Sequence, residues 1–377
     1  MTEWLEPDNQ GGFASGTAAL ARTRRYHALL LTATTPPTGR VVLVNGIEAW
    51  VETPSGRFFL SAQHYAPDTV YPDGADRIAS FTHDPWPAWV FRLPGDTTLS
   101  QEILVDPDAG ETLLRWRIVT GSAGLLSVRP LLSGRDYHSL HRENAGFDFA
   151  ATVRAGNVAW RPYASLPAIA ALTNGAYTHA PQWYRNFLYT AERDRGLDCI
   201  EDLGSPGVFA FDLAAPAVMI LRAGDGLSVR AASRAARLLE SERARRATPA
   251  IARAAGAYFA DRGDGETVIA GFPWFTDWGR DSFIALRGLA LGTGRVAEAE
   301  AILLQWAATV SEGMLPNRFP DASGAPEYNA VDASLWFIVA VHDLLAAGAT
   351  EGRVRLTEAV EAILTGYAAG TRFGIGA

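Results

Sequence analysis

The pattern of apolar and polar residues changes along the chain at about residue 226. From residue 40 to about residue 221, short apolar runs are separated by Gly, Pro, Asp and Asn, which is typical of strands and turns. We expect strands at residues 89–93, 101–105, 112–119, 125–130, 147–153, 198–201 and 208–213. Many closely spaced strands with little helix between them predict an antiparallel β-sandwich.

The clearest turn signal in this first part is Asn45-Gly46, which lies between two β-prone runs in residues 40–52. Asn-Gly is the preferred two-residue hairpin turn because both positions adopt a positive φ. The sequence therefore predicts a hairpin that turns at these two residues.

Helical patterns dominate after residue 226. Segments 229–246 and 249–261 are rich in Ala and Arg, and further helical patterns cover residues 282–291, 295–310, 332–345 and 353–367. We therefore expect two domains, at residues 1–225 and 226–377, with a linker helix region at 226–261. Residues 233–246, heavy in Arg and Glu, have the composition of a solvated helix face.

The connection at residues 311–331 is long for a compact domain. Loops of this length are usually functional or disordered. Trp306 precedes this loop and Trp336 follows it, and the loop itself contains Asn317, Arg318, Asp321 and Gly324. We expect it to be functional.

Composition limits the classes of partner. A chain of 377 residues has the length of two or three domains, and with 48% hydrophobic and 20% charged residues it is neither disordered nor fibrous. The net charge of −8 is spread along the chain, which argues against nucleic acid or a membrane surface as the main partner. A neutral partner fits better, and the oligomeric state stays open.

All 33 basic residues are arginines, so a lysine Schiff base and a P-loop lysine are excluded. The single Cys199 cannot form an internal disulfide, and we expect no metal site and no cofactor. The acidic start lacks an apolar core of signal-peptide length, and no uncharged apolar run reaches about 18 residues. We expect a soluble, cytoplasmic protein.

The densest group of chemically useful side chains is at residues 272–281. Trp274 and Trp278 can form apolar walls, Arg280 can donate through its planar guanidinium, and Asp281 can accept from neighbouring hydroxyls. These are the means by which a site holds a neutral polyol, and 11 Trp, 11 Tyr and 17 Phe suit stacking on sugars. The alternative is that Asp281 or Ser282 caps a helix and Arg280 forms a surface ion pair.

A second group lies just before another predicted helix and consists of Glu327, Asn329, Asp332 and Trp336. One predicted helix separates the two groups. If inner and outer helices alternate around a ring, both groups lie at the same end, together with Asn317 and Arg318.

Hydrolysis of a glycosidic bond needs a protonated carboxylic acid at the leaving oxygen and a second carboxylate. Asp332 is the candidate acid, and it would need burial against aromatic residues or repulsion from Glu327 to stay protonated. The alternative for Asp332 is a simple helix cap.

The basic segment Arg24-Arg25-Tyr26-His27 has no carboxylate or nucleophile at useful spacing. We expect it to have a structural role where the two domains join.

Five segments of the chain carry a family resemblance, at residues 11–16, 23–31, 272–288, 314–319 and 328–336. They resemble the bacterial and archaeal glycogen debranching enzymes of the amylo-α-1,6-glucosidase type, and they follow the family's order over nearly the whole chain. The resemblance implies an N-terminal β-sandwich followed by an (α/α)6 toroid similar to that of glucoamylases.

The resemblance also implies inverting hydrolysis of the α-1,6-linked glucose at a trimmed branch point of glycogen or limit dextrin. Trp278, Arg280 and Asp281 match the family's subsite for the terminal glucose, and Asp332 matches its general acid. The rest of the expected substrate-binding set consists of Trp274, Asn317, Arg318, Glu327, Asn329 and Trp336.

The sequence departs from the family in the number of helices. Six helical segments follow residue 226, half of the twelve that a toroid needs, and we find no candidate for the general base. We therefore expect a chain truncated at its C-terminus, with half a toroid and little or no glucosidase activity. Two alternatives stay open, namely glucoamylase-like or 4-α-glucanotransferase activity on α-1,4-glucans, and a non-catalytic glucan-binding protein.

Overall fold

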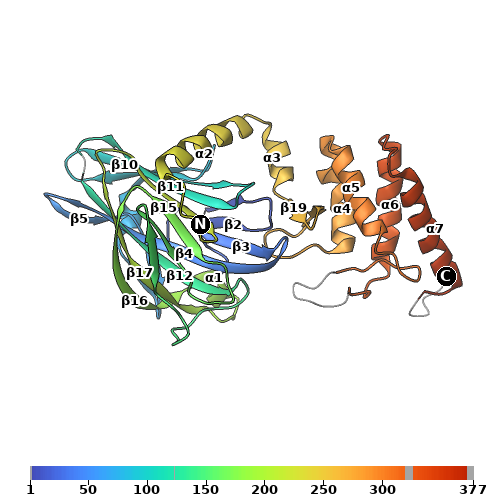
Figure 1. The fold of residues 1–377 in the computed structure, drawn as a ribbon, viewed down its shortest axis with the longest axis horizontal. Helices are drawn as coiled ribbons and strands as arrows, with labels where there is room; N and C mark the ends of the chain where they lie inside the picture. Colours follow the sequence, from blue (N-terminus) through green and yellow to red (C-terminus); the bar gives the residue numbers. More distant parts are fainter. Residues whose placement is uncertain (1, 123, 319–325, 372–377) are drawn as a thin grey trace. The chain divides into compact units, whose positions relative to one another are not determined.

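A computed structural model of the chain describes residues 2–122, 124–318 and 326–371 (Figure 1). The chain divides into two compact units. The first, which we call the β unit, comprises Met1–Asp8, Gly12–Thr34 and Arg40–Ala247. The second, the helical unit, comprises Asn9–Gly11, Thr35–Gly39 and Thr248–Ala377. The β unit thus continues past the boundary that we expect at residue 226.

Two antiparallel sheets make up most of the β unit. Among the described residues, the strands of the first sheet are β1 (Glu3–Pro7), β2 (Phe13–Thr17), β3 (Leu30–Thr35), β4 (Thr38–Thr53), β5 (Gly56–Phe59), β6 (Gln63–Tyr65), β7 (Thr69–Tyr71), β12 (Leu125–Asp136), β16 (Ala176–Leu188) and β17 (Ile200–Asp212). Those of the second are β8 (Ile78–Thr82), β9 (Ala88–Leu93), β10 (Thr97–Asp106), β11 (Glu111–Thr120), β13 (Ala151–Arg154), β14 (Asn157–Trp160), β15 (Ile169–Thr173) and β18 (Ala217–Ala223).

One apolar core joins the two sheets. Leu43, Val128 and Phe209 of the first sheet belong to the same buried cluster as Phe91 and Ile103 of the second. Strands of both sheets therefore bury one face each on the other sheet, as in a sandwich. The antiparallel β-rich first part expected from the sequence is confirmed.

The remaining elements are mainly helical. They are the short helices η1 (Gly74–Arg77), α1 (Thr190–Asp194) and η2 (Leu291–Thr293), the helices α2 (Ala231–Arg245), α3 (Ala250–Gly256), α4 (Gly279–Leu289), α5 (Val296–Ala307), α6 (Asp332–Ala346) and α7 (Arg353–Ala369), and the strand pair β19 (Phe259–Arg262) and β20 (Gly265–Val268). None of the helices in the part of the chain that the structure describes has the length and apolar character needed to cross a membrane.

The predicted hairpin at Asn45-Gly46 is wrong. β4 runs unbroken through both residues, and its pairing with β12 passes from Gly46↔Leu131 to Val44↔Leu132, so that Asn45 is the extra residue of a β-bulge. The buried Asn45 amide donates to Glu201 at 3.1 Å. Long-range pairing thus overrides the local turn preference.

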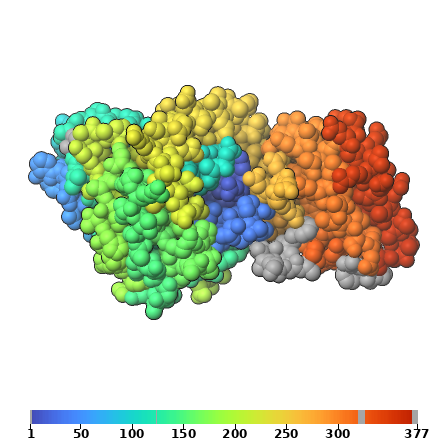
Figure 2. Space-filling model, viewed as in Figure 1, coloured from blue at the N-terminus to red at the C-terminus, as the bar shows by residue number. Residues whose placement is uncertain are grey.

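Helix α2 has a buried face in addition to the solvated face that its Arg and Glu residues predict. This helix, yellow in Figures 1 and 2, lies along the surface of the β unit. Its apolar residues recur at helical spacing, and Leu238 and Leu239 are buried in a cluster with residues of the second sheet. Arg234 reaches Glu111 of that sheet at 2.7 Å. Packing against the sheet explains why α2 belongs to the β unit.

Three strand and helix boundaries also differ from expectation. The expected strands 198–201 and 208–213 fall in the single strand β17, and only the end of 147–153 is a strand, β13. The expected helix 249–261 ends at Gly256, because Phe259 pairs with Val268 in a hairpin. Gly263, at φ 56°, forms the first residue of its two-residue turn.

An aromatic cluster holds three helices of the helical unit together. The ring of Phe283 on α4 makes edge-to-face contacts with Trp306 on α5, at 5.1 Å between centroids, and with Phe337 on α6, at 5.4 Å. All three side chains are buried. α4 packs mainly on α6, and α5 contacts both α6 and α7. This core therefore joins α4, α5 and α6.

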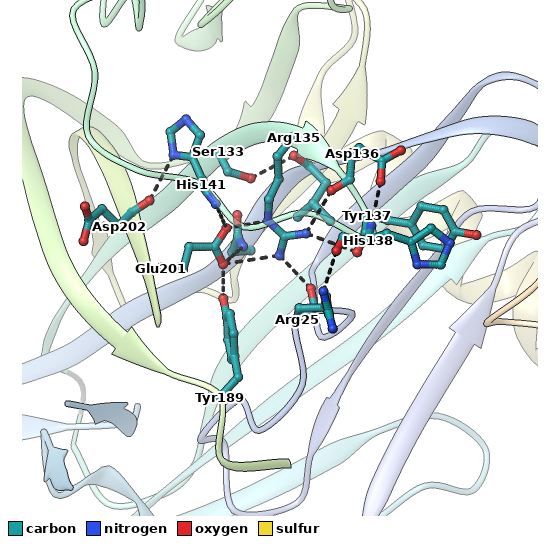
Figure 3. A network of polar contacts seen from close by, with 12 residues as sticks. Arg25, Ser133, Arg135, Asp136, Tyr137, His138, His141, Tyr189, Glu201 and Asp202 are labelled. Carbon is teal, nitrogen blue, oxygen red and sulfur yellow. Dashed lines mark hydrogen bonds and ion pairs between the residues drawn. The ribbon is translucent and has the colours of Figure 1, made fainter. Parts of the chain in front are cut away.

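A buried carboxylate organises the interior of the β unit. Glu201 on β17 accepts hydrogen bonds from the Arg135 guanidinium, the Tyr189 hydroxyl, the Asn45 amide and the His141 backbone N–H (Figure 3). The side chains of both charged residues are almost fully inaccessible. Because each charge has its counter-charge and further hydrogen bonds, the network stabilises the pairing of β4, β12 and β17.

The basic segment expected to be structural is anchored by residues of the β unit. Arg24 pairs with Glu3 at 2.8 Å, and Arg25 lies 3.5 Å from Glu192. His27 is buried, and its Nδ1 accepts the backbone N–H groups of Thr23 and Arg24 at 3.1 and 3.4 Å. Burial and the charges of Arg24 and Arg22 lower the pKa of His27 to about 3.

Glu201→Gln should strongly destabilise the chain, because it leaves the buried Arg135 guanidinium without a counter-charge. We expect the free energy of unfolding to fall by about 3 kcal/mol or more, measured by denaturant titration. Glu52→Gln is the control, since Glu52 pairs with Arg57 on the surface, and it should cost less than about 1 kcal/mol. Equal effects of the two variants would contradict the role of this network.

His27 should make stability depend on pH. Between pH 6.5 and about 3 the unfolded chain protonates this imidazole and the folded chain does not, so stability falls as the pH falls. From pH 7 to pH 5 we expect wild type to lose about 2 kcal/mol more than His27→Gln. The exposed His83 provides the control, because His83→Gln should keep the wild-type pH dependence. Identical pH dependence of wild type and His27→Gln would refute this assignment.

Candidate functional site

Two helices of the helical unit begin at the same place. Arg280, in the first turn of α4, has its Nη1 3.7 Å from Oδ2 of Asp332, the first residue of α6. Its Nε lies 3.8 Å from Oδ2 of Asp281. Arg280 therefore lies between two carboxylates at two adjacent helix N-termini, where the helix dipoles favour negatively charged groups.

The three side chains are accessible to a ligand, because Arg280, Asp281 and Asp332 are each between 45% and 49% exposed. The burial that we expect an acid at Asp332 to need is therefore not supplied by the described side chains. The ion pair between Arg280 and Asp281, part of the alternative interpretation, is present.

Helix capping, the other part of that alternative, is not what the two carboxylates do. The N-cap residues are Trp278 for α4 and Val331 for α6, and neither helix has a side-chain capping bond. Asp281 and Asp332 lie inside the first turns. Neither Asp281 nor Asp332 therefore caps its helix.

The start of α4 is satisfied instead by Asn317, which is 5% exposed. Its carbonyl accepts the N–H of Gly279 at 2.8 Å, and its Oδ1 accepts the N–H of Arg280 at 3.3 Å. These bonds supply acceptors for two of the orphan donors of the helix. Asn317 therefore fixes the backbone that carries Arg280.

Arg318 and Glu327 continue this connection as a small bridge. The backbone of Arg318 pairs with both Trp278 and Glu327, and the N–H of Asn317 donates to the Glu327 carbonyl at 2.8 Å. The Arg318 guanidinium lies 5.3 Å from the centroid of the Trp278 ring. Asn329 closes the group by donating to Glu327 at 3.2 Å and accepting from Asn317 at 3.4 Å.

The structure thus brings together Trp278, Arg280, Asp281, Asn317, Arg318, Glu327, Asn329 and Asp332. The other two candidates lie at its edges. Trp274 is in a turn where its N–H donates to the Gly271 carbonyl at 3.0 Å, and Trp336 packs partly against the helical core. Phe319, Asp321 and Gly324 lie outside the described residues.

Two residues near Asp332 are not identified by the sequence as part of the site. The Tyr367 hydroxyl on α7 donates to the carbonyl of Val331, just before Asp332, and the Ser334 hydroxyl accepts the N–H of Leu315 at 2.9 Å. Burial and the charge of Asp332 raise the pKa of Tyr367, while a hydrogen bond with Ser334 opposes the rise. Ser334 follows Asp332 at close spacing, but nothing in the sequence connects it with Tyr367.

Asp277, the other carboxylate of residues 272–281, has a structural partner. It is 1% exposed, and its Oδ2 lies 2.9 Å from Nη1 of Arg262. Among the described residues, no group of three or more His, Cys, Asp or Glu side chains is placed to hold a metal ion.

Two of the known structures that resemble this chain illustrate how weak the likeness is. A bacterial glucoamylase complexed with acarbose is 13% identical, with a TM-score of 0.47 over 95% of this chain and 58% of that chain. The gh92 family glycosyl hydrolase ccman5 is 12% identical, with a TM-score of 0.38 over 96% of this chain and 52% of that chain. Both scores are too low for the likeness to decide the fold.

Sequence comparison is more specific. The glycogen debranching enzyme of Saccharomyces cerevisiae is 46% identical over 82 residues, which span 20% of this chain and only 5% of that enzyme. The family described as "Glycogen debranching enzyme N terminal" matches residues 2–219, and the one described as "Amylo-alpha-1,6-glucosidase" matches residues 250–377. Since the first match alone covers more than half of the chain, the protein belongs to the glycogen debranching enzyme family.

Proposed function

We propose that the chain acts as a glycoside hydrolase of the amylo-α-1,6-glucosidase type on the branch linkages of glycogen or a similar α-glucan. The observation that carries the proposal is the position of Arg280 between Asp281 and Asp332, inside the segment that matches the family of that name. Two carboxylates and a guanidinium at adjacent helix ends have the chemistry to bind a sugar and protonate its glycosidic oxygen.

The proposal includes the architecture of the helical unit. In a toroid of alternating inner and outer helices, every second helix is a neighbour, and the packing of α4 mainly on α6 agrees with this order. We therefore propose that α4 and α6 are inner helices of an (α/α)6 toroid that follows an N-terminal β-sandwich domain.

In this proposal Arg280 and Asp281 hold the outer hydroxyls of the terminal glucose. The guanidinium supplies several N–H donors in one plane, and the carboxylate accepts from two neighbouring hydroxyls. The ring of Trp278 offers an apolar face for the sugar ring, and the cation–π contact with Arg318 holds that ring in place. Asn317 positions Arg280 through the backbone of α4.

Asp332 is proposed as the general acid. It transfers its proton to the oxygen of the α-1,6 linkage while that bond breaks, and water adds to the anomeric carbon from the opposite face, with inversion. The proton that the water loses goes to a general base, a role that we assign to no residue of this chain. We therefore expect slow turnover by residues 1–377, and the experiments measure binding as well as hydrolysis.

Product analysis separates this function from its alternatives. Incubation with a branched limit dextrin should release free glucose from the branch points. Glucose released from linear maltooligosaccharides would indicate glucoamylase-like activity, and redistributed chain lengths would indicate a glucanotransferase. Binding without hydrolysis, unchanged in Asp332→Asn, would indicate a glucan-binding protein.

Asp332→Asn should lower the rate of glucose release from limit dextrin by about 100-fold or more, because general acid catalysis contributes at least that factor. Maltooligosaccharide binding, measured by calorimetry, should change by less than about threefold, since the amide keeps the size of the carboxylate. Asp343→Asn, near the other end of α6, serves as the control and should retain the rate. A rate in Asp332→Asn close to that of wild type would rule out the assignment of the acid.

Arg280→Gln should weaken the binding of isomaltose, a disaccharide with an α-1,6 linkage, by about 10-fold, because a charge-assisted hydrogen bond is lost. Arg287→Gln, on the same helix, is the matched control, since Arg287 pairs with Asp343 away from the site. Equal affinities of the two variants would show that Arg280 does not contact the sugar.

A further inference from the structure

A small cavity, lined mainly by apolar side chains together with a few polar ones, lies inside the β unit, separate from the residues around Arg280. Its volume is about 50 Å³, and its lining includes Trp4, Leu20, Arg22, Asn45, Gly46 and Gln63. Among the lining residues only Leu20 is not buried. A water molecule occupies about 10–15 Å³ on this measure, so the cavity has room for about three to five heavy atoms. A hexose with its twelve heavy atoms does not fit.

Arg22 supplies a buried positive charge at this cavity. Arg22 is only 6% exposed, and its Nη2 donates to Oε1 of Gln63 at 3.0 Å. Nε and Nη1 have no hydrogen-bond partner among the described residues, and no carboxylate of that part of the chain pairs with this guanidinium. The Phe187 ring, whose centroid lies 5.1 Å from the guanidinium carbon, is the cation's aromatic neighbour. A buried cation without a counter-charge is costly, whereas Arg135 in the same unit has Glu201.

Two further polar atoms at the cavity lack partners in the part of the chain that the structure describes. They are the indole Nε1 of Trp4, a residue that is 7% exposed, and Oδ1 of Asn45, 1% exposed. Arg22 and Trp4 together present several N–H donors, and Asn45 presents one acceptor. A ligand that matches them has several acceptor oxygens and one O–H group.

Three features of the backbone around the cavity fit this arrangement of donors and acceptor. A Cβ atom on Gly46 would lie 2.9 Å from Nη1 of Arg22, so the glycine lets the guanidinium lie against the strand. The bulge at Asn45 directs the Nδ2 of this residue to Glu201. Leu20 has a φ of 69°, a left-handed conformation that is strained for a bulky residue and that concentrates at ligand sites.

We infer that the β unit binds a small oxyanion that carries a proton, such as hydrogen phosphate or bicarbonate, with Arg22 as its main ligand. The guanidinium and the Trp4 indole donate to the anion's oxygens, and the anion's O–H donates to Asn45. The inference is independent of the proposed glycosidase function, because it uses no residue of that site and its test measures binding.

Thermal unfolding of the full chain tests the inference at constant ionic strength, with chloride as the reference salt. At about ten times its dissociation constant, inorganic phosphate or bicarbonate should raise the Tm of wild type by about 3 °C. Arg22→Gln should abolish this rise, whereas Arg92→Gln, a change at an exposed residue of β9, should keep it. Without either anion, Arg22→Gln should be no less stable than wild type, because it removes an unpaired buried charge.

Calorimetry of wild type and Trp4→Phe provides a second readout if Arg22→Gln does not fold. Loss of the indole N–H should weaken phosphate or bicarbonate binding by about fivefold. The inference is overturned if wild type binds neither anion, or if Arg22→Gln keeps the rise in Tm, which would mean adventitious binding elsewhere. Acetate binding as tight as that of the protonated anions would overturn the role of Asn45.

Discussion

Arg135 and Glu201 are buried together in the first sheet, and much of the chain's architecture depends on the constraint that they illustrate: a charge removed from water needs an opposite charge and further hydrogen bonds. Glu201 has four donors from strands and loops far apart in the sequence (Figure 3). Because every basic residue is an arginine, each buried cation brings five N–H donors in a fixed plane. The resulting networks tie the chain together over long sequence distances.

The need of a buried charge for an opposite charge also distinguishes charged residues that stabilise the fold from those that are available to a ligand. The buried Asp277 is paired with Arg262, and the buried Glu111 with Arg234 and Arg222, so these groups are committed to the fold. Arg280, Asp281 and Asp332 are about half exposed and separated by 3.7–3.8 Å, distances at which a ligand hydroxyl can compete. Arg22, by contrast, is buried with two guanidinium nitrogens that have no hydrogen-bond partner among the described residues, and this observation supports the proposed anion site.

Sequence reasoning located the residues around Arg280 because aromatic, acidic and basic side chains are concentrated in two short segments, each of which opens a helix. Prediction from the sequence failed where contacts between residues far apart in the chain determine the local structure. Asn45-Gly46 has the sequence of a turn, but the two residues lie in a strand with a bulge at Asn45, whose side chain bonds to Glu201. The composition of α2 predicts a solvated face, and it does not show that every third or fourth residue of the helix packs on the sheet. Tyr367 lies too far along the chain from Asp332 for any local pattern to connect them.

The central claim, that the N-termini of α4 and α6 form the glucose site, is tested most directly by a crystal structure of the chain with isomaltose. This experiment does not require turnover. The account predicts a glucose ring against Trp278, with its hydroxyls bonded to Arg280 and Asp281 and its glycosidic oxygen near Asp332. Isomaltose bound elsewhere, with Arg280 still paired to both carboxylates, would contradict it.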